Sequence, residues 1–170
     1  MISLSRTALW RNLRFFGIVL RHKWYVFIEC CKLGIPWRGI MHDWSKFSPG
    51  EWRPRVEAYA RGRHSLLDAE GNIDPQKVSE ALALSWLRHY HSNPHHWQWW
   101  VVVLDNGTTR VLPMDDAHRR EMLADWNAIE IALGTNDTPG WYIKNREKML
   151  LHPETAAWVE KQLGLDKEKA

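Results

Sequence analysis

The sequence has only two cysteines, Cys30 and Cys31, and they are neighbours. Adjacent cysteines are badly placed to bond to one another, so a disulfide framework is excluded and two buried, reduced thiols are expected. Long apolar runs are missing as well. The run Phe15–Leu20 is flanked by Arg14 and Arg21, and no cleavage-site pattern follows it. A spanning helix needs roughly 20 apolar residues, so we expect a cytoplasmic protein with no membrane partner.

The sequence also lacks a strong excess of charge of either sign. Its net charge of +3 and pI near 9.0 fit an anionic substrate or a nucleic acid without requiring either. Repeats and low-complexity tracts are missing apart from the charged tail DKEKA at 166–170. A chain of 170 residues suffices for one domain and is short for two, so we predict a single domain over 1–170. Its twelve tryptophans imply a bulky aromatic core with polar partners for the indole N–H groups.

Apolar residues recur at three- and four-residue steps along most of the sequence, which predicts helices. A turn signal at Asp105–Gly107, set among β-branched and aromatic residues, instead predicts one small β-hairpin over about residues 97–112. The predicted fold class is therefore mainly α, a helical domain with one hairpin insertion. The predicted helices are Ser5–Leu33, Trp37–Trp44, a helix that Ser48 caps, Gln76–His91 with Asp74–Pro75 as its cap, Met114–Gly134, and two short helices divided by Pro153.

The histidines are unevenly placed, and four of the nine lie in the stretch RHYHSNPHHWQWW. Within it, Asn93–Pro94 predicts a new turn that His95 and His96 open. Imidazole together with carboxylate suits divalent Mn, Fe, Co, Ni or Zn, and a catalytic ion needs ligands from several elements. We predict one or two such ions per chain, against the alternative that the cluster is purely structural. The candidates are His22, His42, Asp43, His89, His91, His95, His96 and Asp125, with Glu121 one turn before Asp125.

The stretch IMHDWSKF, residues 40–47, resembles the HDxxK centre of the HD-domain superfamily of helical, metal-dependent phosphohydrolases. In that superfamily the ligands follow in the order of an early His, the His–Asp pair at a helix end, further histidines and a distant Asp. Longer stretches, HKWYVFIECCKLGIPWRGIMHDWSKFSP, NPHHWQWW, EMLADW and MLLHPET, look like a family of unknown function from phages and bacteria. That resemblance covers nearly the whole chain and implies a protein of a bacterium or a phage-infected host cell.

The resemblance to HD enzymes implies a phosphohydrolase that attacks a nucleotide or a phosphodiester with a metal-activated water. Under this interpretation His22, His42, Asp43 and Asp125 hold the first ion. His91, His95 or His96 holds a second ion or meets the phosphate. The residues expected to act in catalysis are Asp43, Lys46, His95 and His96. Lys46 would neutralise the phosphate, although its other role, a solvated lysine that pairs with Glu51 or Asp43, is equally open.

Two other functions fit the same residues. The first is a non-catalytic module in which the histidines bind structural Zn and a Trp-rich hairpin docks nucleic acid or a protein partner. Trp97, Trp99 and Trp100 beside the turn could then stack on bases. The second is a di-iron oxygenase of HD type, because the metal sets the chemistry. The expected partner is a phosphorylated small molecule or nucleotide, with nucleic acid also open, and the sequence leaves the oligomeric state undecided.

Overall fold

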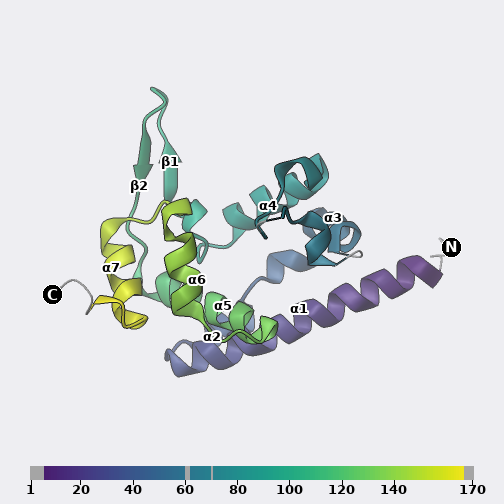
Figure 1. The fold of residues 1–170 in the computed structure, drawn as a ribbon, viewed down its shortest axis with the longest axis horizontal. Coiled ribbons are helices and arrows are strands. Elements are labelled where there is room, and N and C mark those ends of the chain that lie inside the picture. Colours follow the sequence, from purple (N-terminus) through teal and green to yellow (C-terminus); the bar gives the residue numbers. More distant parts are fainter. Residues whose placement is uncertain (1–5, 60–61, 70, 167–170) are drawn as a thin grey trace. The chain divides into compact units, whose positions relative to one another are not determined.

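A computed structural model of the chain describes residues 6–59, 62–69 and 71–166. These residues are mainly helical and include one two-stranded antiparallel sheet (Figure 1), which confirms the predicted fold class. They gather into two compact units, which we call unit 1 and unit 2. Unit 1 takes its described residues from 1–21 and 43–92, and unit 2 takes them from 22–42 and 93–170. The single domain over 1–170 stays a prediction, and residues 167–170 of the charged tail lie outside the described residues.

The first helix, α1, runs over Arg6–Lys32 and supplies residues to both units. It matches the predicted helix, whose first residue, Ser5, lies outside the described residues. The helix ends at Gly34, whose φ of 75° lies in the left-handed region that favours glycine. Pro36 then opens the short helix α2, Pro36–Met41, as expected for a proline in a first helical turn.

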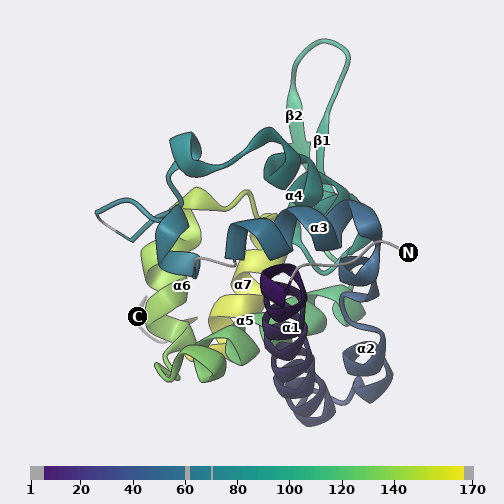
Figure 2. The ribbon, with the colours of Figure 1, turned by 90° about the vertical axis from the view of Figure 1, so that its right-hand side faces the viewer.

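Unit 1 is built on α3, Pro49–Tyr59, and α4, Glu80–Ser92, which lie side by side (Figure 2). Its apolar core joins Phe15 and Val19 of α1 to Val56 of α3. Trp52 packs edge-on against Phe15 with ring centroids 4.9 Å apart, and its indole N–H donates to Asn12 Oδ1 at 2.7 Å. This tryptophan therefore has the polar partner that the composition led us to expect.

The start of α4 differs from the prediction. Asp74 does act as a cap, because its side chain accepts a hydrogen bond from the backbone N–H of Gln76, but the capped element is only the 3₁₀ turn Pro75–Lys77. The backbone is extended at Val78, and the helix begins at Glu80. Ser79 provides the second start signal, since its Oγ accepts from Leu82 N at 3.3 Å. Two capping residues in close succession, Asp74 and Ser79, thus divide the segment that the apolar periodicity predicted as one helix.

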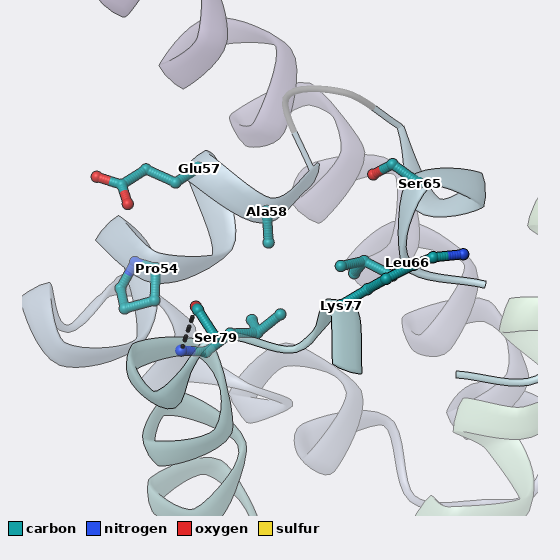
Figure 3. Close-up of a pocket in the computed structure, with 8 residues that line it drawn as sticks. Pro54, Glu57, Ala58, Ser65, Leu66, Lys77 and Ser79 are labelled. Carbon is teal, nitrogen blue, oxygen red and sulfur yellow. Dashed lines mark hydrogen bonds between the residues drawn. The ribbon is translucent and has the colours of Figure 1, made fainter. Parts of the chain in front are cut away.

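Unit 1 also contains a pocket of about 340 Å³ (Figure 3). Among the described residues that line it, the charged ones are Glu57 and Lys77, and Lys77 Nζ already donates to the carbonyl oxygen of Leu67 at 2.6 Å. None of the residues predicted to bind metal or to act in catalysis lines this pocket. The chemistry predicted from the sequence therefore has to be sought elsewhere.

Unit 2 is built on α5, Asp116–Leu133, with α6, Thr138–Asn145, and α7, Pro153–Gln162, packed against it. These helices confirm the three predicted for the C-terminal third of the sequence. Asp115 caps α5 through a hydrogen bond from His118 N at 3.0 Å, and Gly134 ends the helix with a φ of 79°. The main core cluster consists of Met114, Met122, Leu123, Trp126, Tyr142 and Val159.

A second core cluster of unit 2 joins Val26 and Cys30 of α1 to Ala124 and Ala128 of α5. The four side chains are all completely buried. Cys30 is fully buried, whereas Cys31 is exposed. The expectation of two buried thiols was wrong for Cys31, because neighbouring residues on a helix point about 100° apart.

The hairpin consists of β1, Val101–Val103, and β2, Thr109–Val111, in antiparallel register with Val102 opposite Arg110 (Figure 1). It turns at Gly107, whose φ is 80°. The strands are shorter than the predicted 97–112 because Trp97–Trp100 forms a 3₁₀ turn. Trp97 and Trp100 pack against the core, while Trp99 is exposed. The three tryptophans therefore do not share one open stacking surface.

None of the described helices combines the length and the apolar character needed to cross a lipid bilayer.

Candidate metal centre

The His42–Asp43 pair lies at a break between two helical elements and not inside one helix. The predicted helix Trp37–Trp44 in fact ends at Met41, and Trp44–Phe47 forms a separate 3₁₀ turn. Between them His42 is extended, with ψ 129°, and Asp43 is left-handed, with φ 55°. Aspartate is one of the few residues other than glycine that adopts this conformation readily. The break frees the two adjacent side chains from the directions that a continuous helix would impose.

Four histidines of unit 2 come together around Asp125. We call these five residues the Asp125 cluster: His22, His42, His95, His96 and Asp125. The ligand atoms of His22, His42 and Asp125 all lie within 4.8 Å of one another, and so do those of His95, His96 and Asp125. The imidazoles follow one another closely: ring centroids are 5.5 Å apart for His22–His42, 4.4 Å for His42–His95 and 4.2 Å for His95–His96. Asp125 is the residue that the two groups share.

The distances inside the cluster fit the coordination shell of a transition metal. His22 Nε2 lies 3.0 Å from Asp125 Oδ1, and His42 Nε2 lies 3.6 Å from the same oxygen. Two ligand atoms that each lie about 2.1 Å from one ion, at about 90–110° to one another, are about 3.0–3.4 Å apart. The donors therefore already stand close to the separations that an ion requires.

The elements of unit 2 explain why these residues meet. His22 lies on α1, and His42 lies just past α2. His95 and His96 lie in a tight turn that closes when His96 N donates to Asn93 O at 3.0 Å. A turn is therefore present where Asn93–Pro94 predicted one, but it is not helical, and the 3₁₀ turn begins only at Trp97, with His96 as its N-cap. Lys23 holds the end of α2, since its ammonium donates to the carbonyl oxygens of Ile40 and His42.

The helix α5 contributes both carboxylates of the site, Glu121 and Asp125. Residues four apart share one face of a helix, and both side chains are buried, with 5% and 6% exposure. Burial alone would raise the pKa of Asp125, but hydrogen bonds from His22 and His42 hold the pKa of that carboxyl well below its usual range. Burial acts in the same direction on Glu121, and hydrogen bonds from His42 and His95 lower its pKa. Both groups are therefore carboxylates at neutral pH.

Glu121 holds two of the imidazoles in place. Its Oε1 accepts from His42 Nδ1 at 3.1 Å and lies 3.2 Å from His95 Nδ1. Its other oxygen, Oε2, accepts from Arg38 Nη1 at 2.9 Å. A carboxylate on Nδ1 fixes the tautomer of a histidine and leaves Nε2 as the ligand atom. Glu121 therefore turns His42 Nε2 toward Asp125, and Arg38 in turn fixes Glu121.

The buried thiol of unit 2 does not add a sulfur ligand. Burial, and then the charges of Glu121 and Asp125, raise the pKa of Cys30 to about 12. Among the described residues, Cys30 also joins none of the groups of three potential metal ligands. The donors of the site are nitrogen and oxygen, which favours Mn, Fe, Co, Ni or Zn.

Unit 1 contains a separate buried polar network that includes Asp43, the second residue of the His–Asp pair. Asp43 is paired with Lys46, which is one of the two roles that the sequence left open for that lysine. Asp43 Oδ1 also lies 3.4 Å from His89 Nε2, and the Nδ1 of the same ring lies 2.9 Å from Glu51 Oε2. His89 thus bridges two carboxylates from different elements.

The predicted site residues thus fall into three sets. His22, His42, His95, His96 and Asp125 are brought together in unit 2. Asp43 and Lys46 are brought together with His89 in unit 1. His91 is exposed on α4, and among the described residues it joins no group of three potential ligands. A role of Asp43 or His91 as a metal ligand stays a prediction.

Two residues of these networks had no predicted role in metal binding or catalysis. Glu121 stands one helical turn before Asp125, and that spacing on a predicted helix was the available signal. Glu51 was considered only as a partner for Lys46, yet it is 1% exposed and paired with His89. Nothing in the local sequence shows that α4 would bring a histidine to Glu51.

The network of unit 1 should make the stability of the protein sensitive to acid. Burial alone would raise the pKa of Glu51, but hydrogen bonds from His89 and Ser45 outweigh it and lower that pKa below its usual 4.5. A carboxyl group with a lowered folded-state pKa stabilises the fold above its unfolded-state pKa, and this contribution is lost as the pH falls. We expect Glu51→Gln to cost about 1–3 kcal/mol in the free energy of unfolding at pH 7.

The cost of Glu51→Gln should shrink as the pH falls below 4.5, because Glu51 becomes protonated first in the unfolded chain and then, below its lowered pKa, in the folded chain as well. Urea unfolding of both proteins at pH 7 and at about pH 3 would measure this difference. Glu57→Gln, on the same helix, provides the control. An equal cost of Glu51→Gln at both pH values would show that the charge of Glu51 does not stabilise the fold.

Residues 11–165 match a protein family described as a family of unknown function, DUF5662. No curated protein and no solved structure matches the chain. The family match covers all five residues of the Asp125 cluster, together with Glu121 and the network of unit 1. It extends over more than nine-tenths of the sequence, and the chain belongs to this family of unknown function, DUF5662.

Proposed function

We propose that the protein is a metal-dependent phosphohydrolase of HD type that acts on a nucleotide or another phosphate ester. The observation that carries this proposal is the shared position of Asp125, a buried carboxylate that belongs to two groups of possible ligands whose atoms lie within 4.8 Å of one another. The ion is a divalent Mn, Fe, Co, Ni or Zn. The five donors of the Asp125 cluster would hold one or two such ions.

The residues of the cluster fit such an ion by charge as well as by distance. One carboxylate and four neutral imidazoles would compensate part of the charge of a divalent cation in a buried place. When bound, the ion would act as a Lewis acid and lower the pKa of a coordinated water from about 15.7 to about 7. Glu121 keeps the Nδ1 proton on His42, and Arg38 keeps Glu121 in position.

Support for a phosphate ester as the substrate comes from the sequence. The stretch IMHDWSKF resembles the centre of HD phosphohydrolases, and His22, His42, the histidines at 95–96 and Asp125 follow the same order along the chain. The guanidinium of Arg38, whose side chain is 33% exposed, is a cation beside the Asp125 cluster, where it pairs with Glu121. Phosphate esters are recognised by such planar, charged donors.

A hydrolysis screen tests the proposal. Protein purified without a His-tag would be loaded with Mn, Co or Ni and offered nucleotides and a simple phosphodiester. The double substitution His95→Gln/His96→Gln should abolish turnover, because glutamine keeps much of the size and polarity but not the imidazole ligands. His64→Gln, an exposed histidine of unit 1, is the matched control and should keep the parental rate. Unchanged hydrolysis in the double variant would refute this site.

The role of Glu121 gives a further prediction. Glu121 forms a further group of three potential ligands with His42 and His95, but it belongs to neither of the two groups around Asp125. Because it orients both imidazoles, Glu121→Gln should weaken metal binding by about 10- to 100-fold, the usual effect of losing an orienting partner. Titration calorimetry with the same ion would measure this loss. Asp116→Asn, an exposed acidic residue of the same helix, should change little. A complete loss of binding would instead make Glu121 a ligand, and no change would deny it any role.

A further inference from the structure

The part of α1 that belongs to unit 1 has two apolar faces, and only one of them is buried. Phe15 and Val19 lie in the core with Val56. The other face, which we call the outer stripe, consists of Leu9, Trp10, Leu13, Phe16 and Leu20, with exposures of 50%, 56%, 60%, 42% and 46%. At about 100° per residue these five side chains fall within an arc of about 120°. Such an apolar stripe on an exposed helix needs a partner.

The charged side chains that this part of α1 itself carries are all arginines. Around the helix axis, Arg14 and Arg21 lie just beyond Trp10, at one edge of the arc. The guanidinium of Arg14 lies over the Trp10 ring, 5.3 Å from its centroid. Arg6 and Arg11 are exposed on the same stretch. The sequence contains no acidic residue before Glu29. The partner of this face is therefore both apolar and negatively charged.

We infer that the outer stripe binds the surface of an anionic lipid membrane, with α1 lying in the plane of the interface. Tryptophan, phenylalanine and leucine on one side of a helix, with arginines beside them, are typical of interfacial helices. Lipid headgroups supply the negative charge, and the acyl boundary receives the apolar side chains. The proposal goes beyond the proposed hydrolase function and does not depend on it.

Two other occupants fit the face less well. A second copy of the chain that packed stripe against stripe would bring the arginines of both copies together, and this part of α1 contributes no acidic residue between them. A nucleic acid would be held by the arginines but would leave the aliphatic side chains of the stripe without an apolar partner. An anionic membrane satisfies both features.

The inference departs from the sequence-based expectation of no membrane partner. That expectation rested on the shortness of the apolar run, which applies only to a helix that crosses the bilayer. The stripe from Leu9 to Leu20 is about 18 Å long at 1.5 Å per residue, well short of the roughly 30 Å of a hydrocarbon core. A helix that lies in the interface does not have to reach across it.

Co-sedimentation of the full chain with lipid vesicles tests the inference. Vesicles of phosphatidylcholine with about one-third phosphatidylserine should bind the protein, and vesicles of phosphatidylcholine alone should bind it at least about tenfold more weakly. Arg14→Gln/Arg21→Gln should lower the binding to anionic vesicles by about fivefold for each arginine. Raising the salt concentration should weaken binding in the same direction. Equal sedimentation with and without anionic vesicles would overturn the proposal.

Substitutions in the stripe separate the membrane from the other occupants. Leu9→Gln/Leu13→Gln should lower the partition onto anionic vesicles by about tenfold or more. Ile18→Gln is the matched control, because Ile18 is 50% exposed on the same helix but points away from the stripe. Both variants change exposed side chains, and thermal melts would verify that they fold. The inference is overturned if Leu9→Gln/Leu13→Gln binds anionic vesicles as tightly as the parental protein. It is also overturned if the parental protein and the Ile18→Gln control form a dimer or bind an oligonucleotide and Leu9→Gln/Leu13→Gln does not.

Discussion

The substitution Asp125→Asn is expected to weaken the binding of a divalent transition metal by more than about a hundredfold. Asparagine retains the size of the side chain but removes the charge, and Asp125 is shared by both groups of imidazoles. The loss should exceed the 10- to 100-fold effect of a residue that only orients ligands. Helical content should change little, because asparagine can still accept hydrogen bonds from His22 and His42.

Asp116→Asn on the same helix is the control for this experiment, since Asp116 is exposed and pairs only with arginines of its own turn among the contacts of the described chain. Calorimetric titration of both variants with Mn, Co or Ni would give the affinities. If Asp125→Asn bound metal within about threefold of the parental protein, Asp125 would not be a ligand.

Removal of the metal should lower the melting temperature by about 5–10 °C. An ion that binds only the folded chain stabilises it by RT ln(1 + [L]/Kd), about 2.7 kcal/mol at a hundredfold excess over Kd. For a chain of this length each kcal/mol corresponds to about 2–4 °C. Calorimetric scans with saturating metal and with a chelator would measure the shift.

The Asp125→Asn variant supplies the control for chelation. Its melting temperature should differ much less between metal and chelator, because its weakened site is poorly filled. An unchanged melt of the parental protein after verified metal removal would contradict a site that is coupled to folding.

The helices could be predicted from the sequence where their signals are local. Asp115 and Gly134 mark the ends of α5, and the Asn106–Gly107 turn marks the hairpin, because capping and left-handed glycines depend on neighbouring residues only. Prediction was poorer at Trp37–Trp44 and before Glu80. In both places the apolar pattern continues across a point where the helix is interrupted, and the periodicity of the sequence does not show such an interruption.

The candidate site was predictable as a set of residue types but not as a set of contacts. Histidines on several elements indicated a metal, and five of the predicted residues meet at Asp125. The sequence could not show that Glu121 would face His42 and His95, because 79 residues separate His42 from Glu121 along the chain. It also could not show that Asp43 would pair with both Lys46 and His89. Such pairings depend on tertiary structure.

Metal analysis of the protein purified without a His-tag tests the central claim most directly. After incubation with Mn, Fe, Co, Ni or Zn and removal of the excess ion, elemental analysis should find one or two ions of at least one of these metals per chain. Asp125→Asn protein treated in parallel should retain less than about a tenth of that amount. Parental protein that retains no more metal than the Asp125→Asn variant would contradict a metal centre at Asp125.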